Sequence, residues 1–140
     1  PEPVVRGEAG LRQLRAEIAL YRAAHALALG NVAATVAHGG QVLDCIGEGD
    51  PVLRGAASGL LGLAHWTSGN LEDAYRSFAD RLSQLQQAGN LADAIGGAVG
   101  LVDIRVTQGR LREARRICER GLQLAAEHGA PQLRGTADMH

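Results

Sequence analysis

Apolar residues recur along the chain at spacings of three and four, and short glycine-containing breaks interrupt this pattern about every twenty residues. Such spacing places apolar side chains on one face of an α-helix, and the period-two alternation typical of strands is missing. The pattern predicts an all-α fold of antiparallel helix hairpins. The expected helices are 8–29, 32–46, 51–68, 71–88, 91–108 and 111–128, with a seventh beginning at Pro131.

The breaks between the predicted helices repeat with a period close to forty residues. Gly69 and Gly109 lie forty residues apart, as do Pro51 and Leu91. Glycine suits the position just after a helix, and proline suits the first turn of the next one. A period of this length is typical of stacked units that cover one another's apolar faces, so we predict one helical-repeat domain over 1–140. Its units are about 8–50, 51–90 and 91–130, and 131–140 starts a further helix.

The second unit carries a motif that resembles the tetratricopeptide signature, L-G-x-x-Y followed by A-x-x-x-F. The matching residues are Leu61, Gly62, His65, Gly69, Leu71, Ala74 and Phe78. His65 stands where the family has an aromatic residue. The third unit is similar, with Val102 in place of the glycine and Arg105 in place of the aromatic. The resemblance implies a tetratricopeptide-like superhelix.

Two longer phrases, DPVLRGAASGLLGLAHWTSGNLEDA and QGRLREARRICERGLQLAAEHGAP, resemble a narrower family. They are similar to the helical-repeat segment of the LuxR-family, ATP-dependent transcriptional regulators of the MalT type, over about residues 8–140. In that family a nucleotide-binding module precedes the repeats and a helix-turn-helix DNA-binding domain follows them. The resemblance therefore implies that ATP and DNA are handled elsewhere, and that this chain is a fragment of a longer protein.

The composition excludes several kinds of chemistry. All fourteen positions that hold Lys or Arg are arginine, which leaves no lysine for a P-loop, a Schiff base or a general base. The formal net charge of −1 gives no basic balance that would favour nucleic acid or an anionic membrane. Cys45 and Cys118 lie inside predicted helices, and we interpret them as buried free thiols. With no membrane span or signal peptide in the pattern, we expect a cytoplasmic protein without a membrane partner.

Catalytic and metal-binding motifs are also missing from the sequence. The five histidines form neither an HExxH motif nor an i,i+4 pair, and no cysteine lies at ligand spacing from them. No GxSxG nucleophile motif is present. We interpret His65 as a core-edge residue, with a pH-sensitive role as the alternative. We expect no enzymatic activity, no metal and no cofactor in this fragment.

Two further patterns allow more than one interpretation. Arg112, Arg116 and Arg120 share one face of the last predicted helix, with glutamates interleaved. A solvated outer face with some ion pairs is favoured over a phosphate-binding stripe, so no direct contact with nucleic acid is expected. Gly96, Gly97 and Gly100 lie inside a predicted helix without the strand that a nucleotide loop requires. They predict either close packing against that helix or a locally loose helix.

The resemblance places a binding groove on the first helix of each hairpin, which lines the concave side of a tetratricopeptide stack. Trp66 and Thr67 in the second unit and Asp103 and Thr107 in the third are expected on or near this surface, with Glu17 at an equivalent position in the first. A tryptophan with a nearby carboxylate and hydroxyls suits a sugar or a peptide, through stacking and directed hydrogen bonds.

Structural roles remain as alternatives at two of these positions. Trp66 is expected either to contact a ligand or to cap a hairpin junction. Asp103 is expected either to face the groove or to pair with Arg105 or Arg76. The sequence alone does not decide between these roles.

Taken with the resemblance, these features predict a non-enzymatic sensor or interaction segment of a MalT-like regulator. Its concave face would hold an inducer or a regulatory protein, and an oligosaccharide is one candidate effector. A free-standing tetratricopeptide adaptor for a peptide or protein is the alternative. Repeat ends that expose apolar faces would also allow self-association.

Overall fold

A computed structural model describes residues 2–47, 49–129 and 139–140, with side chains described from residue 7 onward. The described part of the chain contains six α-helices and no strand. They are α1 (Glu2–Ala28), α2 (Val32–Ile46), α3 (Pro51–Thr67), α4 (Leu71–Gln87), α5 (Leu91–Thr107) and α6 (Leu111–Glu127). The all-α prediction is confirmed, and α2 to α6 end within one residue of the predicted bounds. The predicted helix from Pro131 begins outside the described residues.

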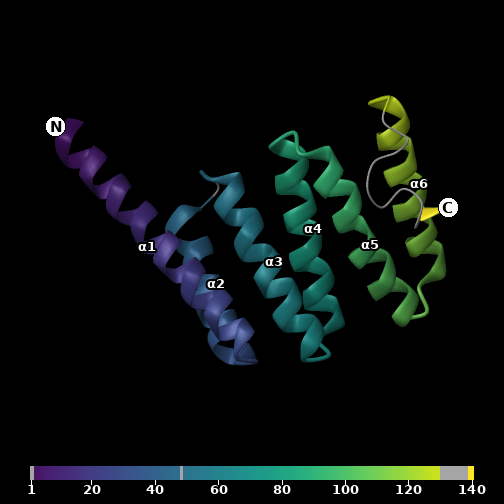
Figure 1. The fold of residues 1–140 in the computed structure, drawn as a ribbon, viewed down its shortest axis with the longest axis horizontal. Helices are drawn as coiled ribbons and strands as arrows, with labels where there is room; N and C mark the ends of the chain where they lie inside the picture. Colours follow the sequence, from purple (N-terminus) through teal and green to yellow (C-terminus); the bar gives the residue numbers. More distant parts are fainter. Residues whose placement is uncertain (1, 48, 130–138) are drawn as a thin grey trace.

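The helices form a row of three antiparallel hairpins, α1/α2, α3/α4 and α5/α6, with the two ends of the chain at opposite ends of the row (Figure 1). Each helix packs against the next, and α1 also packs against α3. The first helix is longer than predicted, because it begins at Glu2 rather than residue 8. Its N-terminal part projects from the row (Figure 1).

The turns between helices are closed by glycine and by backbone hydrogen bonds. Gly69 has φ 80° and Gly109 has φ 72°, a left-handed conformation in which a Cβ would be strained. In the turn after α3, Asn70 N donates to His65 O at 2.9 Å, which satisfies a carbonyl at the helix end. The glycines predicted these helix ends, because each turn needs a residue that adopts the left-handed backbone conformation.

The start of α3 is fixed by a side-chain cap. The Asp50 carboxylate accepts hydrogen bonds from Val52 N and Leu53 N, each at 3.0 Å. The hydrogen bond from Leu53 N is the largest influence on this carboxylate and holds the pKa of Asp50 below its ordinary value. Pro51 follows at the first helical position, where its missing N–H removes no helical bond.

Small residues allow the two helices of a hairpin to approach closely. A Cβ on Gly62 would lie 2.6 Å from the Phe78 ring, so only glycine fits between α3 and α4 at that point. Ala74 and Ala114 are buried at corresponding places in α4 and α6, with exposed fractions of 0% and 4%. These small residues therefore allow close contact between the two helices of each hairpin.

Polar bonds add to the packing between α3 and α4. The Asp80 carboxylate accepts a short hydrogen bond from the buried Ser58 hydroxyl and pairs with Arg54 at 3.3 Å. Arg81 reaches across to donate to Gly55 O at 3.4 Å. The second hairpin is therefore held together by both apolar packing and a bridge of charged and polar groups.

We predict opposite effects for alanine at two helical glycines. Gly62→Ala should lower the free energy of unfolding by about 1–3 kcal/mol, because the new Cβ overlaps the Phe78 ring. Gly97→Ala should raise it by up to about 1 kcal/mol, because no atom lies within 4 Å of the new Cβ and alanine favours the helix. Urea unfolding followed by circular dichroism measures both. Equal effects of the two substitutions would contradict this description of the packing.

Candidate functional site

The predicted groove residues of the second and third hairpins lie near the ends of α3 and α5. Thr67, Asp103 and Thr107 are all exposed. Thr67 and Thr107 occupy the same place in their hairpins, since forty residues separate them. Their hydroxyls donate to carbonyls of their own helices, at 3.0 Å to Ala64 O and 2.8 Å to Asp103 O. The hydroxyl oxygens remain possible acceptors for a ligand.

Two exposed apolar residues on the same surface were missed from the sequence. Leu63 occupies the place in α3 that Asp103 occupies in α5, and it is 45% exposed. Val106 occupies the place that Trp66 occupies in α3, and it is 50% exposed. The forty-residue repeat was the signal that could have identified both. The surface therefore offers apolar contact area beside the polar groups.

Trp66 is half-buried at the junction between the second and third hairpins. Its ring meets Phe78 of α4 edge to face, with centroids 5.7 Å apart and planes at 75°. On the other side, a Cβ on Gly100 of α5 would lie 3.6 Å from the indole. The indole thus connects three helices, as the structural alternative for Trp66 required. Gly100 is explained by this contact, whereas no neighbour approaches Gly97.

Asp103 is not held by either of the arginines considered as partners. Arg76 pairs with Asp73 at 3.4 Å, and Arg105 pairs with Glu72 and Glu113. Among the described residues, no ion pair involves the Asp103 carboxylate. The alternative in which Asp103 pairs with Arg76 or Arg105 is therefore not what the structure shows.

Glu17 is not brought together with the other predicted groove residues. It is half-buried in α1 and accepts a hydrogen bond from Gln13 at 3.2 Å. The turn glycines Gly30 and Gly69 lie 39 residues apart, and this shift pairs Glu17 with Ala56, which is half-buried in α3, rather than with an exposed surface position. The position of Glu17 is therefore not equivalent to those of Thr67 and Asp103.

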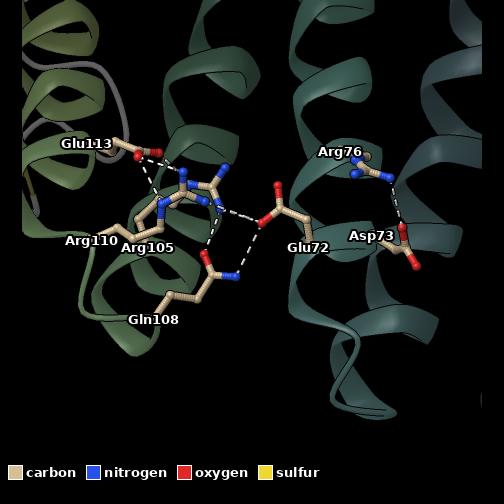
Figure 2. A network of polar contacts seen from close by, with 7 residues as sticks. All are labelled: Glu72, Asp73, Arg76, Arg105, Gln108, Arg110 and Glu113. Atoms are coloured by element: carbon tan, nitrogen blue, oxygen red, sulfur yellow. Dashed lines mark hydrogen bonds and ion pairs between the residues drawn. The ribbon is translucent and has the colours of Figure 1, made fainter.

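The most developed polar site surrounds Arg105, whose side chain is 5% exposed. Its Nη1 lies 2.9 Å from Glu72 Oε2 in α4, and its Nε lies 3.0 Å from Glu113 Oε2 in α6. The guanidinium also lies over the Tyr75 ring, 3.4 Å from the centroid. Figure 2 shows Arg105 between the two carboxylates, with Gln108 and Arg110 completing the network. We call Glu72, Tyr75, Arg105 and Glu113 the Arg105 clasp.

The electrostatics of the clasp favour the charged forms of both main partners. Burial acts to lower the pKa of Arg105, but the hydrogen bond and charge of Glu72 outweigh it and raise the pKa above its ordinary value. The hydrogen bond from Arg105 is the largest influence on Glu72 and lowers the pKa of that carboxyl. The approach of Arg105 Nε to Glu113 is an ion pair without the alignment of a hydrogen bond. The clasp therefore joins α4, α5 and α6 mainly through charge and stacking.

The second hairpin has histidine where the third has Arg105. His65 is half-buried, as the core-edge interpretation predicted, and its Nδ1 is buried without a hydrogen-bond partner among the described residues. From the sequence, Arg105 was seen to replace the aromatic residue of the tetratricopeptide motif. The sequence did not show that Glu72 and Tyr75 contact Arg105. Both lie about thirty residues away in the chain.

The outer face of α6 agrees with the solvated face that was predicted. Arg112, Arg116 and Arg120 are exposed, and Arg115 pairs with Glu119 at 2.8 Å.

Searches for other kinds of site within the described ranges gave negative results. No cluster of three or more potential metal ligands occurs in those ranges. Cys45 and Cys118 are free thiols, half-buried rather than fully buried. None of the described helices combines the length and the apolar character that crossing a membrane requires.

The row of hairpins with a forty-residue repeat defines a helical-repeat protein of the tetratricopeptide-like class. Comparison with known families identifies it further, because residues 16–140 match the MalT-like TPR region. The chain belongs to this family, and it is a TPR region of the kind found in MalT-like regulators. No curated protein and no solved structure matches the chain.

We predict that Glu72→Gln lowers stability near neutral pH, and that its difference from the unmodified protein shrinks at acidic pH. Because the pKa of Glu72 is lowered in the folded state, its contribution is present above the ordinary carboxyl pKa and is lost as pH falls through the lowered value. Urea unfolding between neutral and acidic pH measures this difference. Glu119→Gln, which removes an exposed ion pair, is the control and should have little effect. A difference that does not change with pH would contradict the prediction.

Proposed function

We propose that this chain is the non-enzymatic interaction segment of a LuxR-family, MalT-like transcriptional regulator. Its exposed surface on α3 and α5 binds an inducer or a regulatory protein in the cytoplasm. Membership of the MalT-like TPR family over residues 16–140 is the observation that carries this proposal. ATP and DNA would be bound by other parts of such a regulator, so the proposal assigns no cofactor to this segment.

The contacts of the surface support this role. Leu63 and Val106 supply apolar area, while Asp103 supplies a carboxylate that Arg76 and Arg105 leave unpaired. These groups project from two hairpins that meet at Trp66. A ligand that contacts both hairpins would favour one angle between them, provided that it binds that arrangement more tightly than the other. Such a preference is how an effector could be sensed.

A free-standing adaptor that binds a peptide or protein through the same surface is the second candidate. The apolar residues Leu63 and Val106 favour a peptide or protein over a small polar effector. An enzyme is not proposed, because the surface combines no nucleophile with a general base.

The test is a titration of Trp66 fluorescence with oligosaccharides, short peptides and candidate regulatory proteins. Because the indole lies between the hairpins, its emission should change when a ligand binds or when the angle between the hairpins changes. A saturable change with one class of ligand, weakened about tenfold by Asp103→Ala, supports the proposal. Asp44→Ala, at an exposed position on α2, is the control and should bind normally. Binding that Asp103→Ala leaves unchanged would exclude this surface as the site.

Self-association through the free face of α1 is a further part of the proposal. Leu11, Leu14, Ile18 and Tyr21 form an exposed apolar stripe on this helix. The corresponding face of α3 includes Leu53 and Ala57, which pack against the first hairpin at Ala16, Ala19 and Val42. The stripe on α1 thus has the character of a surface that packs against another hairpin.

We predict that the protein dimerises through this stripe and that Ile18→Glu shifts the dimer to monomer. The substitution places a charge in the apolar contact but leaves the fold intact, because Ile18 is 42% exposed. Sedimentation over a range of protein concentrations measures the change. Val52→Glu, at a 71% exposed position outside the stripe, is the control. A protein that remains monomeric at every concentration would contradict the prediction.

A further inference from the structure

A second candidate site lies on the opposite side of α5 from the surface proposed above. Nine residues separate Ala94 from Asp103 and Ala98 from Thr107. At 3.6 residues per turn, this offset places the two pairs on opposite faces of the helix. The alanines lie in the floor of a groove of about 940 Å³, with α4 and α6 as its walls. The groove is therefore separate from the surface that includes Asp103 and Thr107.

The floor and lower walls of this groove are apolar. Its apolar lining includes Leu82, Ile95, Ala98, Leu101, Ile117 and Leu124. Ile95 and Ala98 are 1% and 4% exposed and belong to a buried cluster with Ala125 and Met139. The apolar surface that a ligand can reach is therefore that of the half-buried wall residues Leu82, Ile117 and Leu124. A volume near the upper end of the range for small-molecule sites, lined in this way, suits a ligand with a hydrocarbon body.

The rim of the groove is positively charged on one side. Arg116 and Arg120 line it from α6, and no described ion pair involves either one. Ser83 and Gln86 line the facing wall on α4 and carry no charge. Glu113, the acidic residue in the lining, is engaged by Arg105 and Arg110. The charge available to a ligand is therefore that of two guanidinium groups, which suits an anion.

The third hairpin differs from the second at two positions beside this groove. Forty residues before Ala98 and Arg120 stand Ser58 and Asp80, whose side chains bond to each other between α3 and α4. In the third hairpin, Ala98 has a methyl group in place of the Ser58 hydroxyl. Arg120 has a guanidinium in place of the Asp80 carboxylate. The polar bridge between the two helices is thereby lost, and Arg120 lines the groove instead.

The width of the groove favours a small molecule over a helix of a partner protein. Its walls, α4 and α6, both pack against α5 and not against each other. Helices in contact lie about 8–10 Å apart, which leaves at most about 10 Å between the surfaces of the walls. A helix with its side chains is about 10–12 Å across, whereas a hydrocarbon chain is narrower.

We propose that the groove between α4 and α6 binds a small amphiphilic carboxylate. Its hydrocarbon chain lies between Leu82 of α4 and Ile117 and Leu124 of α6, and its carboxylate is held by Arg116 and Arg120. This site is independent of the effector surface, so either proposal can fail without the other.

The test is calorimetric titration of the whole chain with dodecanoate below its micelle-forming concentration. Dodecyltrimethylammonium carries the same hydrocarbon chain with the opposite charge, and acetate carries the carboxylate without the chain. We expect one dodecanoate to bind per chain, while the cation and acetate bind at least about tenfold more weakly. Equal binding of the cation, or binding of many molecules per chain, would overturn the proposal.

Variants locate the binding. Arg116→Gln with Arg120→Gln should weaken dodecanoate about tenfold or more, because the charge-assisted hydrogen bonds are lost. Arg112→Gln with Arg115→Gln removes the same charge from α6 outside the groove and should change affinity less than about twofold. Ser83→Trp should block the groove from its exposed wall without disturbing the core. Unchanged binding in the Arg116/Arg120 variant would overturn the proposal.

Discussion

The burial of one positive charge between two hairpins constrains this structure more than any other single contact. A buried guanidinium is costly unless charged partners and hydrogen bonds surround it. Arg105 meets this requirement only when Glu72, Tyr75 and Glu113 are all in place, and these residues come from the helices on either side of α5. The clasp therefore fixes the third hairpin against the second.

The repeats share one backbone plan but differ in what fills the space between helices. In the second hairpin, Ser58 and Asp80 join α3 and α4 near their middle. In the third, the corresponding residues are Ala98 and Arg120, and the strongest polar contacts lie instead at the end of α5, around Arg105. Because the backbone plan is common to all units, distinct binding properties can arise only from such departures. The candidate groove occurs where the third hairpin departs from the second.

Much of the fold could be predicted from the sequence, because its signals are local. Each turn glycine itself adopts the left-handed backbone conformation that ends a helix, so the predicted helix ends lie close to the observed ones. The exposed positions of Thr67 and Asp103 were expected from the resemblance to tetratricopeptide repeats. The Arg105 clasp could not be predicted, because its partners are distant in the chain and each alone is typical of a solvated helix. Glu17 was assigned to the groove, although its repeat equivalent, Ala56, is half-buried rather than exposed.

Hydrogen exchange on an Arg105→Met variant tests most directly whether the clasp holds the third hairpin in place. Loss of the clasp should let α5 and α6 open separately, because neighbouring units in a repeat protein are coupled only through their interface. The account predicts that amides of α5 and α6 lose protection while those of α1 to α4 keep it. Arg76→Met, which removes an exposed ion pair, should leave both groups protected. Unchanged protection of α5 and α6 in Arg105→Met, or equal loss in all six helices, would contradict the account.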